Sequence, residues 1–336
     1  MGIGKADRFQ RRHRVIGVPI AVLYKFFDDQ GNFLAAMVTY YAFVAIFPLL
    51  LLASSIFGFV LQDRPELQQD ALDSALAQFP IIGDQLGAPE GLTGSVGAVV
   101  VGVLAATYGA LGLGQSTQHI MNTAWSVPRN SRPNPLLLRV RSLLLLIVAG
   151  SAVLAISVFS ALGSSSEVFG PAGNAAIRWL ILLGTVAIVT AVLTSLFRLA
   201  AARSHPWVRA VPGAFFTALG WQVLQVGGAW YATRILAETT ALNQTFGLVL
   251  GLIGLIFLAA LVAVLGIEIN VVLVRRLWPR ALLTPFTDAV DLTDADRRAY
   301  AHYAMAQRHK GFETVSVRFD GRDGDTHEID QVPPSS

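Results

Sequence analysis

The chain has 336 residues, of which 54% are hydrophobic and only 14% are charged, and its formal net charge at pH 7 is +3. Soluble globular proteins carry about 25% charged residues, so this deficit indicates a surface that faces lipid. So small a net charge gives little basis for binding nucleic acid. The absence of cysteine excludes a disulfide framework, a thiolate nucleophile and a cysteine-ligated metal site.

Residues 1–32 predict a cytoplasmic amphipathic helix. Val15, Val18, Val22 and Phe26 recur at near-helical spacing, and several arginines precede them. Two interpretations stay open. The segment either lies at the membrane interface, drawn to anionic lipid headgroups, or packs as a helix beneath the rest of the protein.

Six apolar stretches follow, each long enough to cross a hydrocarbon core of about 30 Å as a helix. They are Phe33–Leu61, Gly94–Met121, Leu143–Leu162, Trp179–Phe197, Gly213–Leu236 and Phe246–Val274. We therefore expect an all-α, polytopic membrane protein with a six-transmembrane-helix bundle over residues 33–280. The N-terminal amphipathic segment, 1–32, precedes this domain, and a short cytoplasmic tail, 281–336, follows it.

The lysines and arginines alternate between the segments that connect these stretches. From the N-terminal segment to the tail, the seven segments hold 6, 1, 4, 1, 3, 1 and 9 of them. Positive charge accumulates on the cytoplasmic side of membrane proteins, so the pattern places both termini in the cytoplasm.

Polar groups inside lipid are costly and mark either a site or a bond between helices. Glu268, followed by Asn270 in Gly266-Ile267-Glu268-Ile269-Asn270, is the clearest acid within a predicted span. Glu268 either handles a proton or a substrate, or it is a structural acid that bonds a neighbouring helix or the Arg275-Arg276 pair.

Other polar side chains within the spans complete a candidate intramembrane polar site. They are Tyr40 and Tyr41 in the first span, Gln115, Gln118 and Asn122 in the second, and Gln222 and Gln225 in the fifth. The second-span residues recur at i, i+3 and i+7, so they predict one polar helix face turned toward protein or water. The glutamines of the fifth span either hydrogen-bond across the bundle or line a polar path. The tyrosines either shape a cavity wall or pack tightly.

The last predicted span is followed by the interfacial motif Arg275-Arg276-Leu277-Trp278-Pro279-Arg280. Arginines suit lipid phosphates and tryptophan suits headgroup depth, so Arg275, Arg276 and Trp278 predict a membrane anchor. In the tail, Thr293 and Asp296 have the spacing of a capping box and predict a helix to about His309. Thr314–Phe319 alternates like a short strand, and Gly321–Ser336 has the composition of a disordered segment.

No catalytic, metal or cofactor motif is recognisable. The six histidines are scattered, without the spacing of a zinc site. Neither a phosphate-binding loop nor a pore signature is found. The sequence thus predicts a protein that is not an enzyme and needs no cofactor.

Several motifs together resemble the YihY / virulence factor BrkB family. The resemblance lies in Thr39-Tyr40-Tyr41-Ala42-Phe43 with Phe47-Pro48-Leu49, in Pro212-Gly213-Ala214, in Phe246-Gly247 and in Gly266–Asn270, which is similar to the family's G-A-E-L-N. It implies a bacterial inner-membrane protein with six helices and cytoplasmic termini. Some members carry an old label of ribonuclease BN, but the lack of zinc-ligand motifs argues against nuclease activity in this chain.

The sequence leaves two functions open. The first is transport or flipping of a lipid or a small envelope-related solute, for which the polar residues within the spans are the basis. The alternative is a non-transporting scaffold in envelope maintenance, which recruits partners through the tail and the first external loop, Gln62–Thr93. The expected partners are membrane lipids and further copies of the chain in a homo-oligomer, and not nucleic acid.

Overall fold

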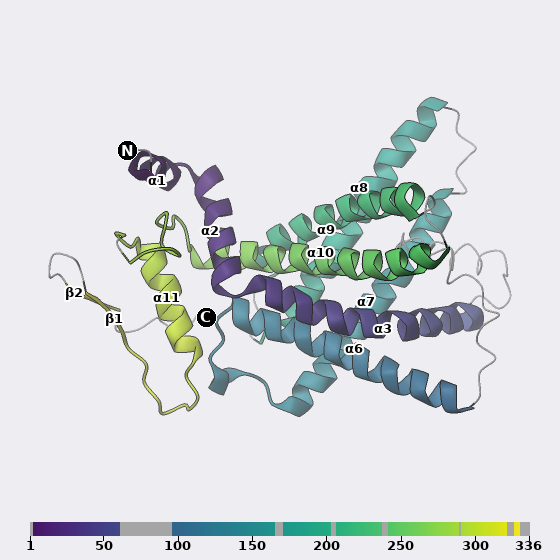
Figure 1. Cartoon of the computed structure of the whole chain (residues 1–336), viewed down its shortest axis with the longest axis horizontal. Coiled ribbons are helices and arrows are strands. Elements are labelled where there is room, and N and C mark those ends of the chain that lie inside the picture. Colours follow the sequence, from purple (N-terminus) through teal and green to yellow (C-terminus); the bar gives the residue numbers. More distant parts are fainter. Residues whose placement is uncertain are drawn as a thin grey trace.

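The computed structural model describes residues 3–60, 96–164, 171–202, 206–236, 241–288, 290–320 and 326–329, so the predicted external loop, Gln62–Thr93, lies outside the described residues. Six long helices form its body (Figure 1). They are α3 (Gly31–Val60), α6 (Val96–Ala124), α7 (Pro135–Ser164), α8 (Pro171–Ala200), α9 (Trp207–Trp230) and α10 (Ala241–Arg275). A π-helical turn, η3 (Tyr231–Leu236), continues α9. Each of the six predicted apolar stretches falls on one of these helices.

The dimensions and surfaces of these helices fit a lipid environment. Even α9, with 24 residues, extends for about 36 Å at 1.5 Å per residue. Among the described residues, Leu182–Ala200 and Phe246–Arg275 are apolar enough over a sufficient length to cross a membrane. Large apolar side chains are also exposed along α7, α8, α9 and α10, and such extensive apolar surface is unusual for a protein surrounded by water.

Glycines set the closest helix crossing, between α9 and α10. A Cβ atom on Gly213 would overlap the carbonyl oxygen of Gly266, and one on Gly266 would overlap the hydroxyl of Thr217. The Asn270 side chain joins the same two helices, because its Oδ1 accepts from the Gly213 amide (2.8 Å) and its Nδ2 donates to the Ala210 carbonyl (3.1 Å). Small residues and an interhelical amide are common means of holding helices together in lipid.

Similar contacts join α6 to its neighbours. Tyr41 of α3 packs against the bare backbone of Gly112, and Gly114 lies against Ser142 of α7. Gln118 Nε2 donates to Ser142 Oγ (3.0 Å) and to the Leu138 carbonyl (3.0 Å). The polar side chain at this position therefore binds α6 to α7.

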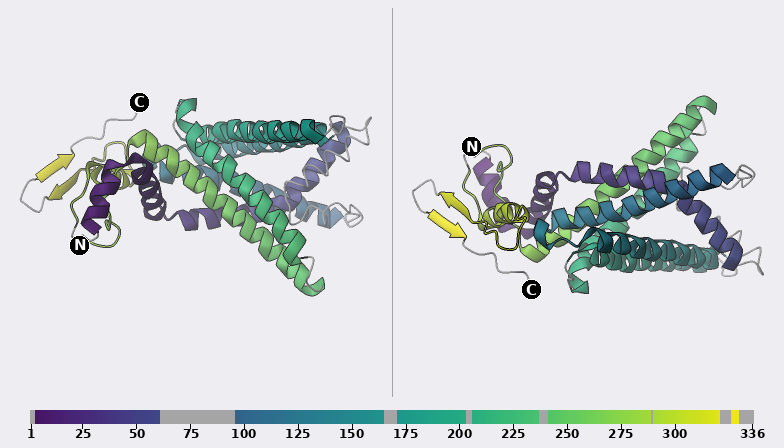
Figure 2. Two further views of the ribbon diagram at one scale, coloured as in Figure 1. Left: turned by 90° about the horizontal axis from the view of Figure 1, so that it is seen from above. Right: turned by 90° about the horizontal axis from the view of Figure 1, so that it is seen from below.

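The N-terminal helices and the described part of the tail lie together at one end of the bundle, as Figures 1 and 2 show from three directions. The N-terminal part forms α1 (Ile3–Arg12) and α2 (Arg14–Asp28). Val22 and Phe26 of α2 are buried in the main hydrophobic core, while Leu23 and Phe27, on the neighbouring face, are exposed. One face of α2 thus packs beneath the bundle, and its other apolar face is free to contact the membrane interface.

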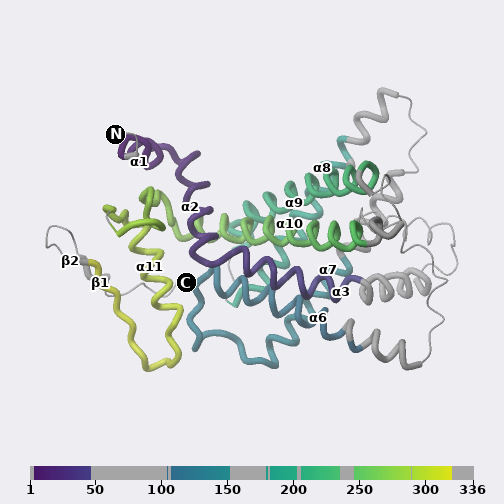
Figure 3. Tube along the Cα trace, in the orientation of Figure 1, coloured from purple at the N-terminus to yellow at the C-terminus, as the bar shows by residue number. Residues whose placement is uncertain are grey.

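The tail forms α11 (Asp294–Ala306) and a two-stranded antiparallel hairpin of β1 (Val317–Asp320) and β2 (Thr326–Ile329). The capping box of Thr293 and Asp296 is present, and α11 ends three residues before the predicted position. The expectation of disorder from Gly321 onward is wrong for Thr326–Ile329, because pairing with β1 gives these polar residues backbone partners. The described fold is therefore mainly helical, with a small hairpin added. Figure 3 traces its path.

We predict that Gly213→Ala destabilises the α9–α10 crossing by about 1–3 kcal/mol, because the added methyl group overpacks against the Gly266 carbonyl. The change should appear as a lower melting temperature of the purified protein in detergent. Gly227→Ala, on the same helix but with open space around the glycine, is the matched control and should not lower it. Equal effects of the two substitutions would contradict this account of the crossing.

Candidate functional site

Three charged side chains are buried where α2, α3 and α10 meet. Lys25 of α2 donates to Asp29, and its Nζ lies 3.5 Å from Oε2 of Glu268 on α10. The side chains of Lys25, Asp29 and Glu268 are 1%, 2% and 0% exposed. Charges buried so completely are tolerated when they are paired, and this triad supplies the pairing.

Local structure explains how the triad forms. Lys25 and Asp29 are four residues apart, so they share one face of a helical turn. Asp29 ends α2, and Gln30 adopts a left-handed conformation (φ 56°) that turns the chain into α3. Glu268 then approaches from the last third of α10, on the side that packs against α2.

Helix α11 closes the other side of the triad. The Lys25 ammonium lies 5.0 Å from the centre of the Tyr303 ring. Burial, together with the neighbouring carboxylates of Asp29, Asp28 and Glu268, raises the pKa of the Tyr303 phenol, so Tyr303 is neutral. Burial and the nearby Arg275 and Lys25 lower the pKa of His302 to about 3. A neutral His302 adds no positive charge to the triad at pH 7.

The charges of the triad do not balance. When its three members are ionised, Lys25 supplies one positive charge against the negative charges of Asp29 and Glu268, which leaves one net negative charge. Neither Glu268 oxygen has a hydrogen bond of good geometry within the described part of the chain. The arrangement can therefore hold one additional proton.

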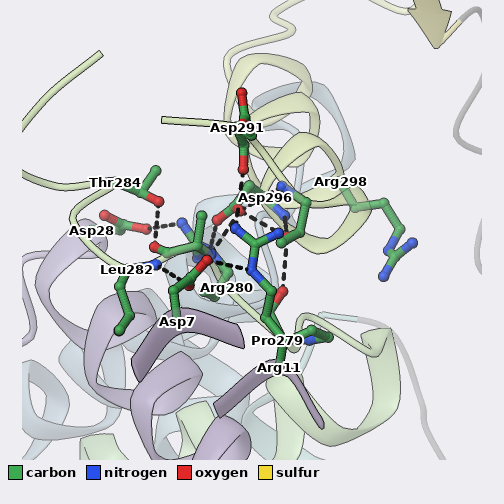
Figure 4. Close-up of polar contacts among 12 residues, drawn as sticks. Asp7, Arg11, Asp28, Pro279, Arg280, Leu282, Thr284, Asp291, Asp296 and Arg298 are labelled. Carbon is green, nitrogen blue, oxygen red and sulfur yellow. Dashed lines mark hydrogen bonds and ion pairs between the residues drawn. The ribbon is translucent and has the colours of Figure 1, made fainter. Parts of the chain in front are cut away.

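A second buried cluster lies beside the triad and is centred on Arg280 (Figure 4). The Arg280 side chain is 0% exposed, its Nε donates to Asp296, and its Nη2 lies 3.2 Å from Oδ2 of Asp28. Burial alone would lower the pKa of Arg280, but the carboxylates of Asp296 and Asp28 outweigh it and raise this pKa. The guanidinium also lies 5.4 Å from the ring centre of Tyr300. Arg280 is thus held as a permanent cation.

Asp296 connects this cluster to the backbone. Its Oδ2 accepts from the amide of Ala281 (2.9 Å), and from the amide (2.9 Å) and hydroxyl (2.7 Å) of Thr293. One carboxylate therefore caps α11, holds Arg280 and fixes the start of the turn-containing segment that follows Arg280. Figure 4 shows Asp296 beside Arg280.

The first helix is bound to the same segment. Asp7 accepts from the Leu282 amide (2.9 Å), and Gln10 donates to the Arg280 carbonyl (2.6 Å). Arg11 donates to the Asp291 carbonyl (3.2 Å). We name the two clusters, with α1, α2, α11 and residues 276–293, the ion-pair junction. It joins both ends of the chain to the end of α10.

The structure distributes the predicted polar residues among separate contacts. Glu268 belongs to the triad, Asn270 joins α9 to α10, and Gln118 joins α6 to α7. The others differ in exposure: Asn122 is buried, Tyr41, Gln222 and Gln225 are half-buried, and Tyr40 and Gln115 are exposed. Of this predicted set, Asn270 alone lines the pocket that the described residues form at the ends of α6, α8, α9 and α10. The contacts of Gln118, Asn270 and Glu268 thus hold different pairs of helices.

The predicted membrane anchor makes contacts within the protein. Arg275 donates to the Trp125 carbonyl and lies over the Trp125 ring. The carbonyl of Arg276 accepts from Arg298 (2.7 Å). Trp278 packs against the main core, with the Arg14 guanidinium 5.3 Å from its ring centre. Lipid contact by these residues stays a prediction.

Sequence reasoning missed most of the junction. The sequence gives Lys25, Asp28 and Asp29 no role beyond their charge, and it places Arg280 in an interfacial motif, whereas the structure buries Arg280 in ion pairs. A signal was available in the i, i+4 pair of Lys25 and Asp29 directly before an apolar span, because such a pair can enter the interior already neutralised. The capping box identified Asp296, but not its bond to Arg280.

The junction contains ion pairs and, in the triad of Lys25, Asp29 and Glu268, the capacity to hold one additional proton. Among the described residues, no group of three histidine, aspartate or glutamate side chains could hold a metal ion.

We predict that Asp296→Asn lowers the free energy of unfolding by about 3–5 kcal/mol, because it leaves the buried Arg280 without its main partner. Asp294→Asn is the matched control in the same helical turn. The Asp294 side chain is 86% exposed and lies 3.8 Å from Arg297, so its loss should cost no more than about 0.5 kcal/mol. Denaturant unfolding in detergent, followed by tryptophan fluorescence, measures both. Similar losses in the two variants would show that the buried pair has no special role.

Comparison with known proteins supplies a family. The family model described as virulence factor BrkB matches residues 22–285, which include the last two turns of α2, the six long helices and Arg280. No curated protein and no solved structure matches the chain. The match covers more than half of the 336 residues and agrees with the apolar helices, so the chain is a membrane protein and belongs to the virulence factor BrkB family.

Proposed function

We propose that the chain is a multi-pass protein of the bacterial inner membrane, with six spans and both termini in the cytoplasm, and that it is not an enzyme. The six long helices and the alternation of basic residues between their connections support this topology. The ion-pair junction then lies on the cytoplasmic side. Because the chain has no cysteine, single cysteines can report the side of each segment directly.

We predict that cysteines placed at Asn130 and Asp294 stay unlabelled by a membrane-impermeant maleimide in intact cells and react after permeabilisation. A cysteine at Gln85, in the predicted external loop, should react in intact cells. Labelling of position 294 from outside would overturn the proposed topology.

Within that membrane, the function that the geometry supports best is a scaffold for envelope maintenance. The observation that carries this proposal is that polar residues within the helices bind neighbouring helices to one another. Glu268, Asn270 and Gln118 each hold a different pair of elements together, as expected of a rigid body. The ion-pair junction fixes the tail to this body, and Phe286 and Phe312 of the tail are 79% and 90% exposed. Exposed aromatic side chains are typical of protein-binding surfaces.

Transport or flipping of a lipid or small solute is the second candidate, and one observation favours it. The triad of Lys25, Asp29 and Glu268 is buried at the end of α10 and has one negative charge in excess. Buried acids of this kind serve as proton carriers in many transporters. A protonation step at Glu268 would couple a proton to rearrangement of α2 against α10.

A pair of measurements separates the two functions. Wild-type protein and Glu268→Gln are reconstituted in liposomes, and lipid scrambling and proton-driven uptake are recorded. The scaffold proposal predicts that both match empty vesicles. A wild-type rate several-fold above empty vesicles that falls in Glu268→Gln would establish transport in its place.

The second measurement uses a strain that lacks the gene. The double substitution Phe286→Ser and Phe312→Ser should fail to restore exclusion of a membrane-impermeant dye, while the protein reaches the membrane at the wild-type level. Asp294→Asn is the surface control on the same tail and should restore it. Full restoration of dye exclusion by the double variant would show that the exposed aromatic side chains of the tail are not needed for the proposed function.

Membrane lipids, and further copies of the chain through its exposed apolar helix faces, are the partners we propose. We propose no role in binding or cleaving nucleic acid, because the formal net charge of the chain is only +3.

A further inference from the structure

A pocket lies at the end of the bundle that carries the ion-pair junction, between the last turns of α6 and α8, the first turns of α9, and α10. Its floor is apolar and includes Met121, Phe197 and Ile267, and two arginines, Arg198 of α8 and Arg209 of α9, also line it. A pocket with apolar walls and two cations suits an amphiphile whose head is an anion.

The positive charge around this pocket has little to balance it. Between Gly91 and Ala237 the sequence contains nine arginines and a single acidic residue, Glu167. Among the described residues, neither Arg198 nor Arg209 forms an ion pair with a carboxylate. Glu268 is near in sequence to the pocket residues Ile267 and Asn270, but its charge is directed to Lys25.

The surface next to the pocket is suited to lipid chains. Val208, Val211 and Phe215 of α9 are 79%, 41% and 48% exposed and recur on one helix face. Trp207, at the start of α9, is half exposed and lies under the Arg198 guanidinium, 4.5 Å from its ring centre. Tryptophan prefers the headgroup depth of a bilayer, so the arginines lie where phosphates of the cytoplasmic leaflet would be.

We propose that this pocket binds the phosphate head of an anionic phospholipid through Arg198 and Arg209, with the acyl chains lying along the exposed face of α9. Basic pockets between membrane helices on the cytoplasmic side recognise lipid heads in this way. The proposal needs the membrane embedding proposed above, but it is independent of whether the protein is a scaffold or a transporter.

The test titrates full-length protein in detergent with short-chain phosphatidylglycerol, phosphatidylcholine and inorganic phosphate, and records the melting temperature. Phosphatidylglycerol should raise it, and neither of the other two should. Arg198→Gln with Arg209→Gln should weaken the affinity for phosphatidylglycerol about 10- to 30-fold, since each arginine near a membrane surface adds roughly fivefold. Stabilisation by inorganic phosphate at equal concentration would show a free-anion site and overturn the lipid assignment.

Arg129→Gln with Arg139→Gln is the matched control. This double variant also removes two positive charges, but Arg129 lies between α6 and α7, Arg139 lies at the start of α7, and neither lines the pocket. The affinity for phosphatidylglycerol should therefore stay within about twofold of the wild type. An equal loss in both double variants would show a diffuse charge effect and overturn the site.

The wild-type protein provides a readout that does not depend on the folding of any variant. A photoactivatable phosphatidylglycerol should crosslink within residues 197–215, and an excess of unlabelled phosphatidylglycerol should compete. Crosslinks concentrated on α1 and α2 would instead assign lipid binding to the amphipathic segment and would overturn the proposal. The cysteine-labelling experiment tests the membrane topology separately, so the two failures can be distinguished.

Discussion

The structure depends on the burial of two cations against four carboxylates at one end of a helical bundle. Lys25 faces Asp29 and Glu268, and Arg280 faces Asp28 and Asp296. Replacing such groups by apolar ones is often neutral, but removing one partner leaves an uncompensated charge in the interior. The ion pairs therefore act less as a source of stability than as a constraint, because α2, the end of α10 and α11 must lie together for all of these pairs to form.

This constraint explains why the ends of the chain are ordered together. Residues near position 10 and residues near position 290 are bound by hydrogen bonds that close most of the chain into a loop. Closing a long loop costs little more entropy than closing a medium one, because the cost grows with the logarithm of loop length. The long helices reduce the cost further, since they fold locally and carry the two ends to the same side of the bundle.

The polar residues of the bundle divide into two classes with different consequences for function. Gln118 and Asn270 are satisfied by backbone and side-chain partners on neighbouring helices, so they position helices. Glu268 has an ion pair but lacks well-formed hydrogen bonds within the described residues, and its cluster has an excess negative charge. The excess negative charge makes the triad that contains Glu268 the place where the described part of the chain can take up a proton. The pocket lined by Arg198 and Arg209 does not include Glu268.

The sequence by itself determined the positions of the six long helices, the clustering of basic residues in alternate connections, the capping box of α11 and the family. These features are local, because apolar run length and charge spacing act over one or two helical turns. It identified Glu268 and Asn270 as unusual residues but left their partners open. Only the tertiary structure decided that Glu268 faces Lys25 and not Arg275, that Asn270 binds the backbone of α9, and that Asp296 holds Arg280 while it caps its helix. The β2 strand was missed for the same reason, since its polar sequence is stabilised by pairing with β1. Partners of buried polar groups depend on which elements pack together, whether the two residues are 16 apart, as Arg280 and Asp296 are, or more than 200 apart, as Lys25 and Glu268 are. The local sequence pattern does not specify that choice.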